Sequence, residues 1–234
     1  ATGVTYDVAP APDGPATGAC LILVTPDAQR TMNTYLGASV HLGPDDIDRS
    51  RIERASVLYL EGYLFDPPEA QEAFRVAARY AHDAGRIVSA TLSDSFCVER
   101  HRGAFTDLVR NHLDLVFANE AEILALYETD DFEVALGRVR DQVPYAALTR
   151  SEKGSVVVTP EEVIQVPAER VEVLVDTTGA GDLYAAGFLY GFSRGAEPAD
   201  CGHLGSSAAA EVISHLGARP EANLRDMAAK VLRG

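Results

Sequence analysis

Residues 171–192, VEVLVDTTGAGDLYAAGFLYGF, form the most informative pattern of the chain. An apolar run is followed by an acidic residue, then by a turn almost free of side chains, and then by a second acidic residue. The pattern predicts a helix over 181–195. The turn consists of Gly179, Ala180 and Gly181. A helix that begins at such residues directs unpaired N–H groups and the positive end of its dipole at one point, which predicts an anion site.

Asp182 stands in the first turn of that helix, beside the anion site. The helix dipole favours its ionised form, so the carboxylate is available as a base toward a substrate hydroxyl. An anion site with an adjacent carboxylate base supplies two of the parts that phosphoryl transfer requires. A glycine-rich turn with a capping aspartate would explain Asp182. It would not explain why a second acidic residue, Asp176, stands at the other end of the turn.

Other glycine-rich nucleotide motifs fit this turn less well. Its spacing differs from the GxGxxG of dinucleotide-binding dehydrogenases, and it lies late in the chain. A P-loop is excluded, because the sequence GK followed by serine or threonine occurs nowhere in the chain. A kinase without a P-loop is therefore the leading interpretation.

The chain ahead of this motif alternates strands with helices from about residue 56. Repeated βα units predict an α/β fold, with a mostly parallel sheet covered by helices on both faces. Ligands of such sheets bind beyond the carboxyl ends of the strands. Still earlier, residues 19–25 and 30–36 predict a hairpin with a turn at Pro26-Asp27. The predicted strands of the sheet are 57–60, 87–92, 113–118, 145–149, 155–159 and 163–166, and the predicted helices are 67–84, 99–111, 120 onward, 132–142, 181–195, 200–213 and 224–232.

Composition narrows the function classes. The net charge of −15 argues against a nucleic-acid partner, because the phosphate backbone would be repelled. A local group of amides, one arginine and a metal can still bind ATP against a distant acidic surface. The three cysteines form no CxxC pair, which predicts a reducing, cytoplasmic setting. The apolar stretches are too short or too charged to span a membrane, and no secretion signal is expected.

DTTGAGD followed by a small-residue helix resembles the signature of the ribokinase-like sugar and nucleoside kinases, the pfkB family. The resemblance implies a ribokinase-like three-layer α/β/α fold with a small β-rich lid. It also implies ATP and Mg²⁺ as cofactors and phosphorylation of a sugar or nucleoside hydroxyl. Asp182 would be the catalytic base, and the amides of the turn Gly179–Gly181 would surround the transferred phosphoryl group.

Two further motifs support the resemblance. Asn119 and Glu122, in the sequence NEAE, match the family's NxxE element, which implies that they organise Mg²⁺ through its waters near the phosphates. The alternative is a helix-capping asparagine followed by a solvated glutamate. Thr149, Ser151 and Gly154, in the sequence TRSEKG, match the family's TxGxxG loop at the ATP phosphates. Ser151 stands where glycine is usual in that loop.

The resemblance implies roles for five other residues. Arg30 occupies the place of the lid arginine that reaches the transferred phosphate in adenosine kinases, although one arginine in a strand is more often a surface residue. The helix near the carboxyl terminus resembles the family's helix beside the adenine ring. Ala209 and Ile213 would line that pocket, and core packing explains them equally well. The carbonyls of Asp176 and Thr178 are expected to hold a monovalent cation such as K⁺.

The expected acceptor is a nucleoside or a sugar. Residues 30–38 and 61–63 look closest to bacterial adenosine-kinase-like members of the family, which favours an adenosine-like nucleoside. A sugar kinase of the ribokinase or fructokinase type is the first alternative. The second is a non-catalytic nucleotide-binding regulator with the same fold, although such a protein needs the pocket and not the base.

The resemblance begins part-way into the family's fold. Ahead of this point, family members carry the opening strands, most acceptor-binding residues and a Gly-Gly motif, so we expect the chain to be part of a longer protein. Residues 1–40 would form part of the β-rich lid with its connections, and residues 41–234 the nucleotide-binding and catalytic domain. Lid strands in this family often pair with another subunit, which predicts a homodimer through the lid.

Overall fold

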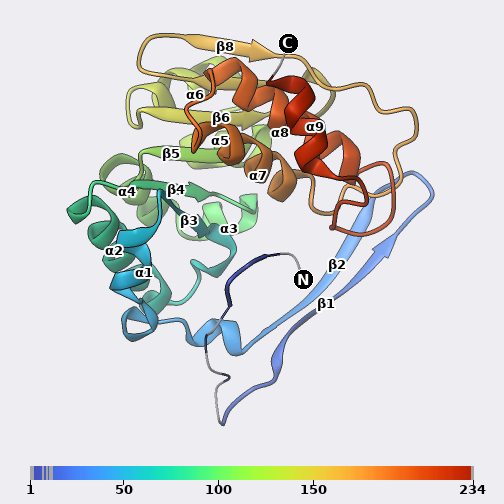
Figure 1. Cartoon of the computed structure of the whole chain (residues 1–234). Helices are drawn as coiled ribbons and strands as arrows, with labels where there is room; N and C mark the ends of the chain where they lie inside the picture. Colours follow the sequence, from blue (N-terminus) through green and yellow to red (C-terminus); the bar gives the residue numbers. More distant parts are fainter. Residues whose placement is uncertain (1–2, 7, 9, 11–12, 233–234) are drawn as a thin grey trace.

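The protein is described by a computed structural model that covers residues 3–6, 8, 10 and 13–232. Its main sheet has six strands in the order β3-β4-β5-β6-β7-β8 (Figure 1). The first four strands run parallel, and β7 and β8 continue the sheet in antiparallel pairing. The predicted α/β class with a mostly parallel sheet is confirmed. The strands are β3 (Val57–Glu61), β4 (Ile87–Thr91), β5 (Leu115–Asn119), β6 (Tyr145–Thr149), β7 (Ser155–Val158) and β8 (Val163–Val166).

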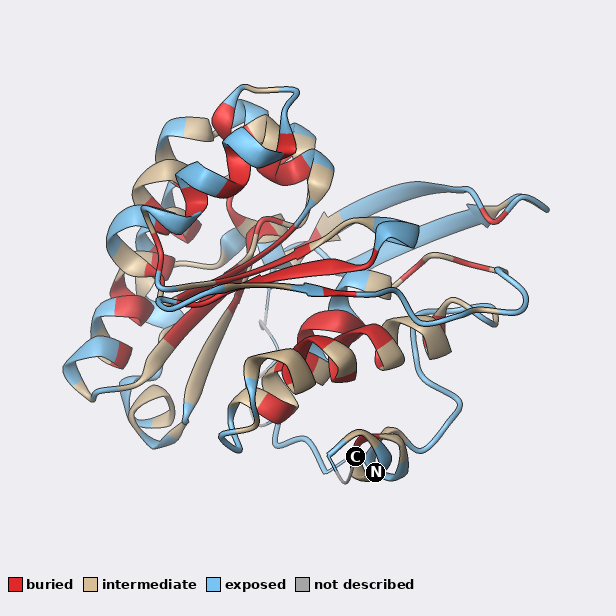
Figure 2. Cartoon of the chain, turned by 90° about the horizontal axis from the view of Figure 1, so that it is seen from above, coloured by how far each residue is buried: buried red, intermediate tan, exposed pale blue. Residues whose placement is uncertain are grey.

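Helices cover both faces of this sheet, so the molecule has three layers (Figure 2). On one face, buried residues of α2, α4, α5 and α6 join the sheet in the larger core cluster. On the other face, α7 and α8 pack against Leu115, Phe117 and Ala147 of the strands. The helices are α1 (Arg49–Arg54), α2 (Pro68–Asp83), α3 (Ser95–Arg100), α4 (Arg102–His112), α5 (Glu120–Tyr127), α6 (Phe132–Arg140), α7 (Ala180–Phe192), α8 (Pro198–Val212) and α9 (Leu224–Val231), and the 3-10 turns are η1 (Ala38–His41), η2 (Pro44–Asp46), η3 (Gly62–Leu64) and η4 (Ser151–Lys153).

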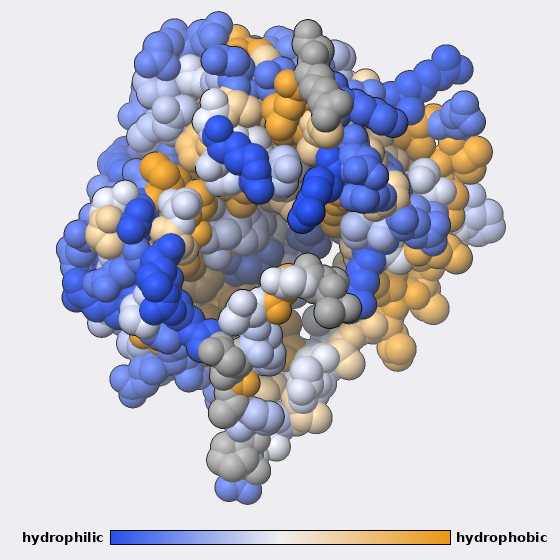
Figure 3. Space-filling model, in the orientation of Figure 1, coloured by the Kyte–Doolittle hydropathy of each residue, from blue (hydrophilic) through white to orange (hydrophobic). Residues whose placement is uncertain are grey.

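The predicted amino-terminal hairpin is present as a separate two-stranded antiparallel sheet, β1 (Thr17–Val24) with β2 (Arg30–Gly37). It projects from the α/β body (Figure 1), and apolar side chains gather along it in the space-filling view (Figure 3). Leu21, Leu23 and Tyr35 are 74%, 64% and 55% exposed. These exposed apolar residues suit contact with another surface, and the homodimer through this hairpin stays a prediction.

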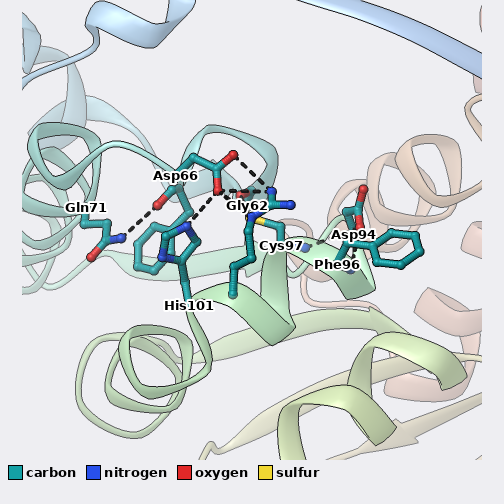
Figure 4. Close-up of polar contacts among 9 residues, drawn as sticks. Gly62, Asp66, Gln71, Asp94, Phe96, Cys97 and His101 are labelled. Atoms are coloured by element: carbon teal, nitrogen blue, oxygen red, sulfur yellow. Dashed lines mark hydrogen bonds and ion pairs between the residues drawn. The ribbon is translucent and has the colours of Figure 1, made fainter.

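One predicted helix is wrong. Residues 99–111 were expected to form a single helix, but the structure has α3 and α4 with a break at His101, whose backbone leaves the helical region at φ −120°. The His101 ring turns to Asp66, with Nε2 2.7 Å from Oδ1, and Arg100 binds the same carboxylate (Figure 4). Asp94 caps the start of α3 by accepting from the backbone of Phe96. A long-range ion pair therefore sets the helix boundary, which apolar periodicity does not reveal.

Among the described residues, no helix is both long enough and apolar enough to cross a lipid bilayer. The cytoplasmic setting and the division into a lid and a catalytic domain stay predictions.

Candidate active site

The turn before α7 has the conformation that an anion site requires. Gly179 is the residue that precedes the helix, with a left-handed backbone at φ 83°, and α7 begins at Ala180, one residue earlier than predicted. A Cβ on Gly179 would lie 2.9 Å from the Cβ of Ala218, whereas a Cβ on Gly181 would meet nothing within 4 Å. Within the described part of the chain, the N–H groups of Gly181 and Asp182 donate to no protein acceptor. These amides and the exposed Asp182 carboxylate therefore face open space together.

Asp176, at the other end of the turn, is buried and serves the backbone. Its Oδ1 accepts hydrogen bonds from the Thr178 N–H at 2.9 Å and the Thr178 hydroxyl at 2.6 Å, and its Oδ2 accepts from the Gly217 N–H at 3.0 Å. Burial alone would raise the pKa of Asp176, but these hydrogen bonds outweigh it and hold the pKa below its usual value. The carboxylate thus ties the turn to the loop after α8. The predicted monovalent-cation site at the Asp176 and Thr178 carbonyls stays a prediction.

Arg30 lies against the same turn, although 147 residues separate it from Thr177. Its Nη1 donates to the Thr177 hydroxyl at 2.5 Å, and its charge contributes to lowering the pKa of Asp176. Figure 1 shows the start of β2 beside the loop that leads into α7. The hairpin therefore brings one guanidinium to the turn before α7, where the anion site is predicted.

Asn119 and Glu122 form the start of α5 and bond each other. Asn119 Oδ1 accepts from the Glu122 N–H at 2.9 Å, while Glu122 accepts from the Asn119 N–H at 2.9 Å and from Asn119 Nδ2 at 2.6 Å. The capping alternative thus describes the asparagine, but the glutamate is only 6% exposed and not solvated. Burial raises the pKa of Glu122 to about 7, and the charges of Asp94 and Glu61 add to the rise.

The loop after β6 keeps the backbone of a glycine-rich turn. Thr149 ends β6 and pairs with Ser155 of β7. Ser151 has φ 51°, the left-handed region that favours glycine, so the serine adopts a backbone conformation typical of glycine. Gly154 has φ 86°, and a Cβ there would lie 2.1 Å from the Val166 carbonyl oxygen. Gly154 therefore lets this loop pack closely on the backbone at Val166, and the role of Thr149, Ser151 and Gly154 at the ATP phosphates stays a prediction.

An open groove of about 520 Å³ lies between residues 169–173 and α8. Ala209 and Ile213 are absent from its lining: Ala209 packs with the core around Phe117, and Ile213 packs against Leu183. Both residues make core contacts, and their role beside an adenine ring stays a prediction. The groove is lined instead by Ser207, Ala210 and Glu211 of α8 and by Ser214 just beyond its end. Their spacing of three, four and seven residues was the sequence signal for this face.

Sequence reasoning also passed over the carboxylates at the ends of β3 and β4. Glu61, quoted above only as part of a resemblance, ends β3 and accepts a hydrogen bond from the Ser93 hydroxyl. Its pKa is raised, first by burial and then by the charge of Asp182. The carboxylate of Asp94 acts on Glu122 in the same way. The carboxyl edge of the sheet therefore holds several acids close to the base candidate.

Comparisons with known proteins show the family to which the chain belongs. A sequence model of the pfkB family of carbohydrate kinases matches residues 1–224. The chain belongs to this family. Its members are kinases that transfer a phosphoryl group to a hydroxyl, and the three-layer architecture described above is the ribokinase-like fold.

Two solved structures from this family resemble the chain over nearly its whole length. The probable sugar kinase protein of Rhizobium etli CFN 42 is 51% identical with a TM-score of 0.94, over 97% of this chain and 69% of that one. The adenosine kinase of Sinorhizobium meliloti is 49% identical with a TM-score of 0.94, over 97% and 70%. A nucleoside kinase of Methanocaldococcus jannaschii is 32% identical over 111 residues, 45% of this chain and 34% of that protein. The match thus spans about a third of the length of that relative.

Proposed function

We propose that this pfkB-family chain carries the transfer centre of an ATP-dependent kinase that phosphorylates a hydroxyl of a nucleoside or sugar. The proposal depends on three groups that lie at the turn before α7. They are the amides of Gly181 and Asp182, which have no protein acceptor among the described residues, the Asp182 carboxylate and the Arg30 guanidinium. Anion donors, a base and a cation are the parts that an in-line phosphoryl transfer needs.

In the proposed reaction, the acceptor hydroxyl gives its proton to Asp182 as its oxygen attacks the γ-phosphorus. The new P–O bond forms while the bond to the β-phosphate oxygen breaks, which leaves ADP. Charge on the equatorial oxygens is met by the amides of the turn Gly179–Gly181 and by Arg30. The base of ATP is expected beside α8, in keeping with the resemblance of this helix to the family's helix next to the adenine ring.

Asn119 and Glu122 fit a Mg²⁺ site in the chemistry of their donors. Both offer side-chain oxygens, the kind of ligand Mg²⁺ prefers, and Glu122 is buried without an ion-pair partner among the described residues. Mg²⁺ bound there would neutralise phosphate charge. The residues themselves fix the start of α5 and hold a carboxylate toward the carboxyl edge of the sheet.

Two acceptors are proposed: an adenosine-like nucleoside is the first candidate, and a sugar is the second. The two structural relatives support one form each, since one is named an adenosine kinase and the other a probable sugar kinase. An ADP-release assay over a panel of nucleosides and sugars, on the protein that contains this chain, tests both. ATP binding without turnover of any acceptor would favour a nucleotide-binding regulator instead.

Replacing Arg30 by alanine is expected to lower kcat by about 10²–10³, the usual effect of removing one donor to a developing negative charge. The melting temperature should change little, because Arg30 is exposed on β2. Steady-state ADP release and thermal unfolding give the two readouts. Arg79→Ala, which removes an exposed arginine from α2, is the matched control. Unchanged turnover in Arg30→Ala would reduce Arg30 to a surface residue that bonds Thr177.

Replacing Glu122 by glutamine separates capping from metal binding, since glutamine can still accept from the Asn119 N–H. The pKa of Glu122 lies near 7 against an ordinary 4.5, so its protonated form is favoured in the folded state. Its contribution to stability is complete below pH 4.5 and is lost as the pH rises toward 7. We therefore expect Glu122→Gln to melt at least as high as the unmodified protein at pH 8 and to need more Mg²⁺ for half-maximal turnover.

Thermal melts at pH 5 and pH 8 and a Mg²⁺ titration of turnover check this expectation. Glu133→Gln, at the exposed start of α6, is the control for the same chemical change. An unchanged Mg²⁺ requirement in Glu122→Gln would leave the residue with the capping role alone.

A further inference from the structure

The loop that follows β6 is fastened to the start of α5 by one guanidinium. Nη2 of Arg150 donates to Oε1 of Glu120 at 2.8 Å, and Nζ of Lys153 lies 3.5 Å from Oε2 of the same carboxylate. The side chains of Arg150 and Glu120 are 19% and 27% exposed, whereas that of Lys153 is 57% exposed. An ion pair that is partly sheltered from water is screened less than a surface pair, so Arg150 provides the firmer of the two contacts.

The Arg150 side chain is also held by an aromatic ring. Its Cζ lies 3.7 Å from the centroid of the Phe132 ring, and Phe132 is a buried residue at the start of α6. A guanidinium over the face of a ring gains cation–π attraction, and its plane is kept in one orientation. The hydrogen bond from Arg150 holds the pKa of Glu120 below its usual value, so the carboxylate stays ionised. Arg150 therefore joins the loop to two helices, α5 and α6.

Both residues of the ion pair stand next to residues of the candidate site. Asn119, which precedes Glu120, pairs across the sheet with Thr149, which precedes Arg150. Glu122 follows Glu120 by two residues, and its carboxylate accepts from the backbone and side-chain N–H groups of Asn119. The ion pair thus fixes the loop of residues 149–154 relative to residues 119–122, at the carboxyl edge of the sheet.

We propose that Arg150 is a positioning residue, which sets the separation of residues 149–154 from residues 119–122 through its ion pair with Glu120. This role rests on the proposed function, in which Asn119 and Glu122 hold Mg²⁺, and on the predicted place of the loop at the ATP phosphates. Mg²⁺ requires nearly ideal octahedral geometry and is commonly bound by carboxylates together with phosphates, so the separation of the two sets of oxygens matters. Arg150 acts through Glu120 and does not touch the nucleotide.

The linkage between Mg²⁺ and ADP tests this role without any transfer step. ADP is titrated by calorimetry into the protein that contains this chain, with and without Mg²⁺, and the ratio of the two dissociation constants is compared between variants. Arg150→Met keeps an unbranched side chain against Phe132 and removes the charge. We expect it to reduce the ratio by about 10-fold, within the usual range of coupling between two sites.

The outcomes separate this role from the proposed function. An unchanged ratio in Arg150→Met, with ADP still bound, would overturn the role of Arg150 and leave the proposed function standing. No binding of ADP by the unmodified protein would overturn both. Arg102→Met is the matched control and should keep the ratio, because Arg102 forms its ion pair with Glu128 at the far end of α5, with a distance of 3.0 Å.

Glu120→Gln separates positioning from direct contact with phosphate. If Arg150 acts through Glu120, the glutamine variant should lose as much linkage as Arg150→Met, and the double variant should lose no more than either single one. If the guanidinium bound phosphate instead, Glu120→Gln would release it and raise the affinity for ADP. Arg150→Met would then lower that affinity equally with and without Mg²⁺. This pair of results would overturn the positioning role.

Hydrogen exchange in the ligand-free protein gives a second readout. The N–H groups of Arg150, Lys153 and Gly154 donate within the loop at 2.8, 3.0 and 3.0 Å. We expect these amides to exchange about 10-fold faster in Arg150→Met and in Glu120→Gln, because a loop without its charged hydrogen bond opens more often. Their exchange should be unchanged in Arg102→Met. Unaltered exchange in both Arg150→Met and Glu120→Gln would also overturn the proposal.

Discussion

Asp182→Asn is expected to lower kcat by about 10²–10⁴ with little effect on KM for ATP, the usual contribution of a positioned general base. The asparagine keeps the size of the side chain and cannot take the proton of the acceptor hydroxyl. The side chain is exposed at the start of α7 and makes no hydrogen bond to another described residue, so folding should be preserved.

Single-turnover and steady-state ADP release, with thermal melts, measure this effect. Asp200→Asn is the matched control, because Asp200 also lies in the first turn of a helix, α8. If Asp182→Asn kept near-normal turnover while the melts stayed equal, the base would have to be another group, and Glu61 at the end of β3 would be the next carboxylate to test.

Gly179→Ala and Gly181→Ala are both expected to lose turnover, but for different physical reasons. Alanine at 179 must adopt φ 83° and places its Cβ 2.9 Å from Ala218, so the turn has to shift. A non-glycine residue in this backbone region costs about 1–3 kcal/mol, so we expect a lower melting temperature together with lost turnover. Alanine at 181 meets no protein atom within 4 Å, so the protein should melt normally.

Gly181→Ala should nevertheless lower kcat by about 10²–10³, because the methyl group occupies the space in front of the amides where the phosphoryl group is proposed to lie. Thermal unfolding and ADP release on both variants separate the two effects. Gly103→Ala, at an α4 position where a Cβ also meets nothing within 4 Å, is the control for the loss of a glycine. Normal turnover in Gly181→Ala would place the phosphates elsewhere.

Local patterns predicted local structure well. The strands of the sheet, the hairpin and the helix after DTTGAGD follow from apolar runs, turn residues and periodicity, and the structure contains each of them. The break between α3 and α4 was missed, since His101 at the break forms a hydrogen bond with Asp66, 35 residues away. Glu122 was expected to be either solvated or near a metal, and its burial beneath the carboxyl edge could not be read from the sequence NEAE.

The sequence also could not show which side chains of α8 contact the core and which line the groove beside it. Ala209 and Ile213 were predicted to line the adenine pocket; both are partly buried residues that pack against core clusters, and their place beside an adenine ring stays a prediction. The neighbouring face, with Glu211, lines the groove. Helical spacing defines the faces of a helix, and only the packing of that helix decides which face meets a ligand.

The sequence by itself determined the glycine turn before α7, because Gly179 and Gly181 act through their own backbone and the helix that follows them. It also determined the alternation of strands and helices that places this turn at the edge of a sheet. The tertiary structure alone decided what stands around the turn: Arg30 beside Thr177, and Asp176 bonded to Gly217. These contacts join residues brought together by packing, and their partners depend on the whole fold and not on the neighbouring sequence.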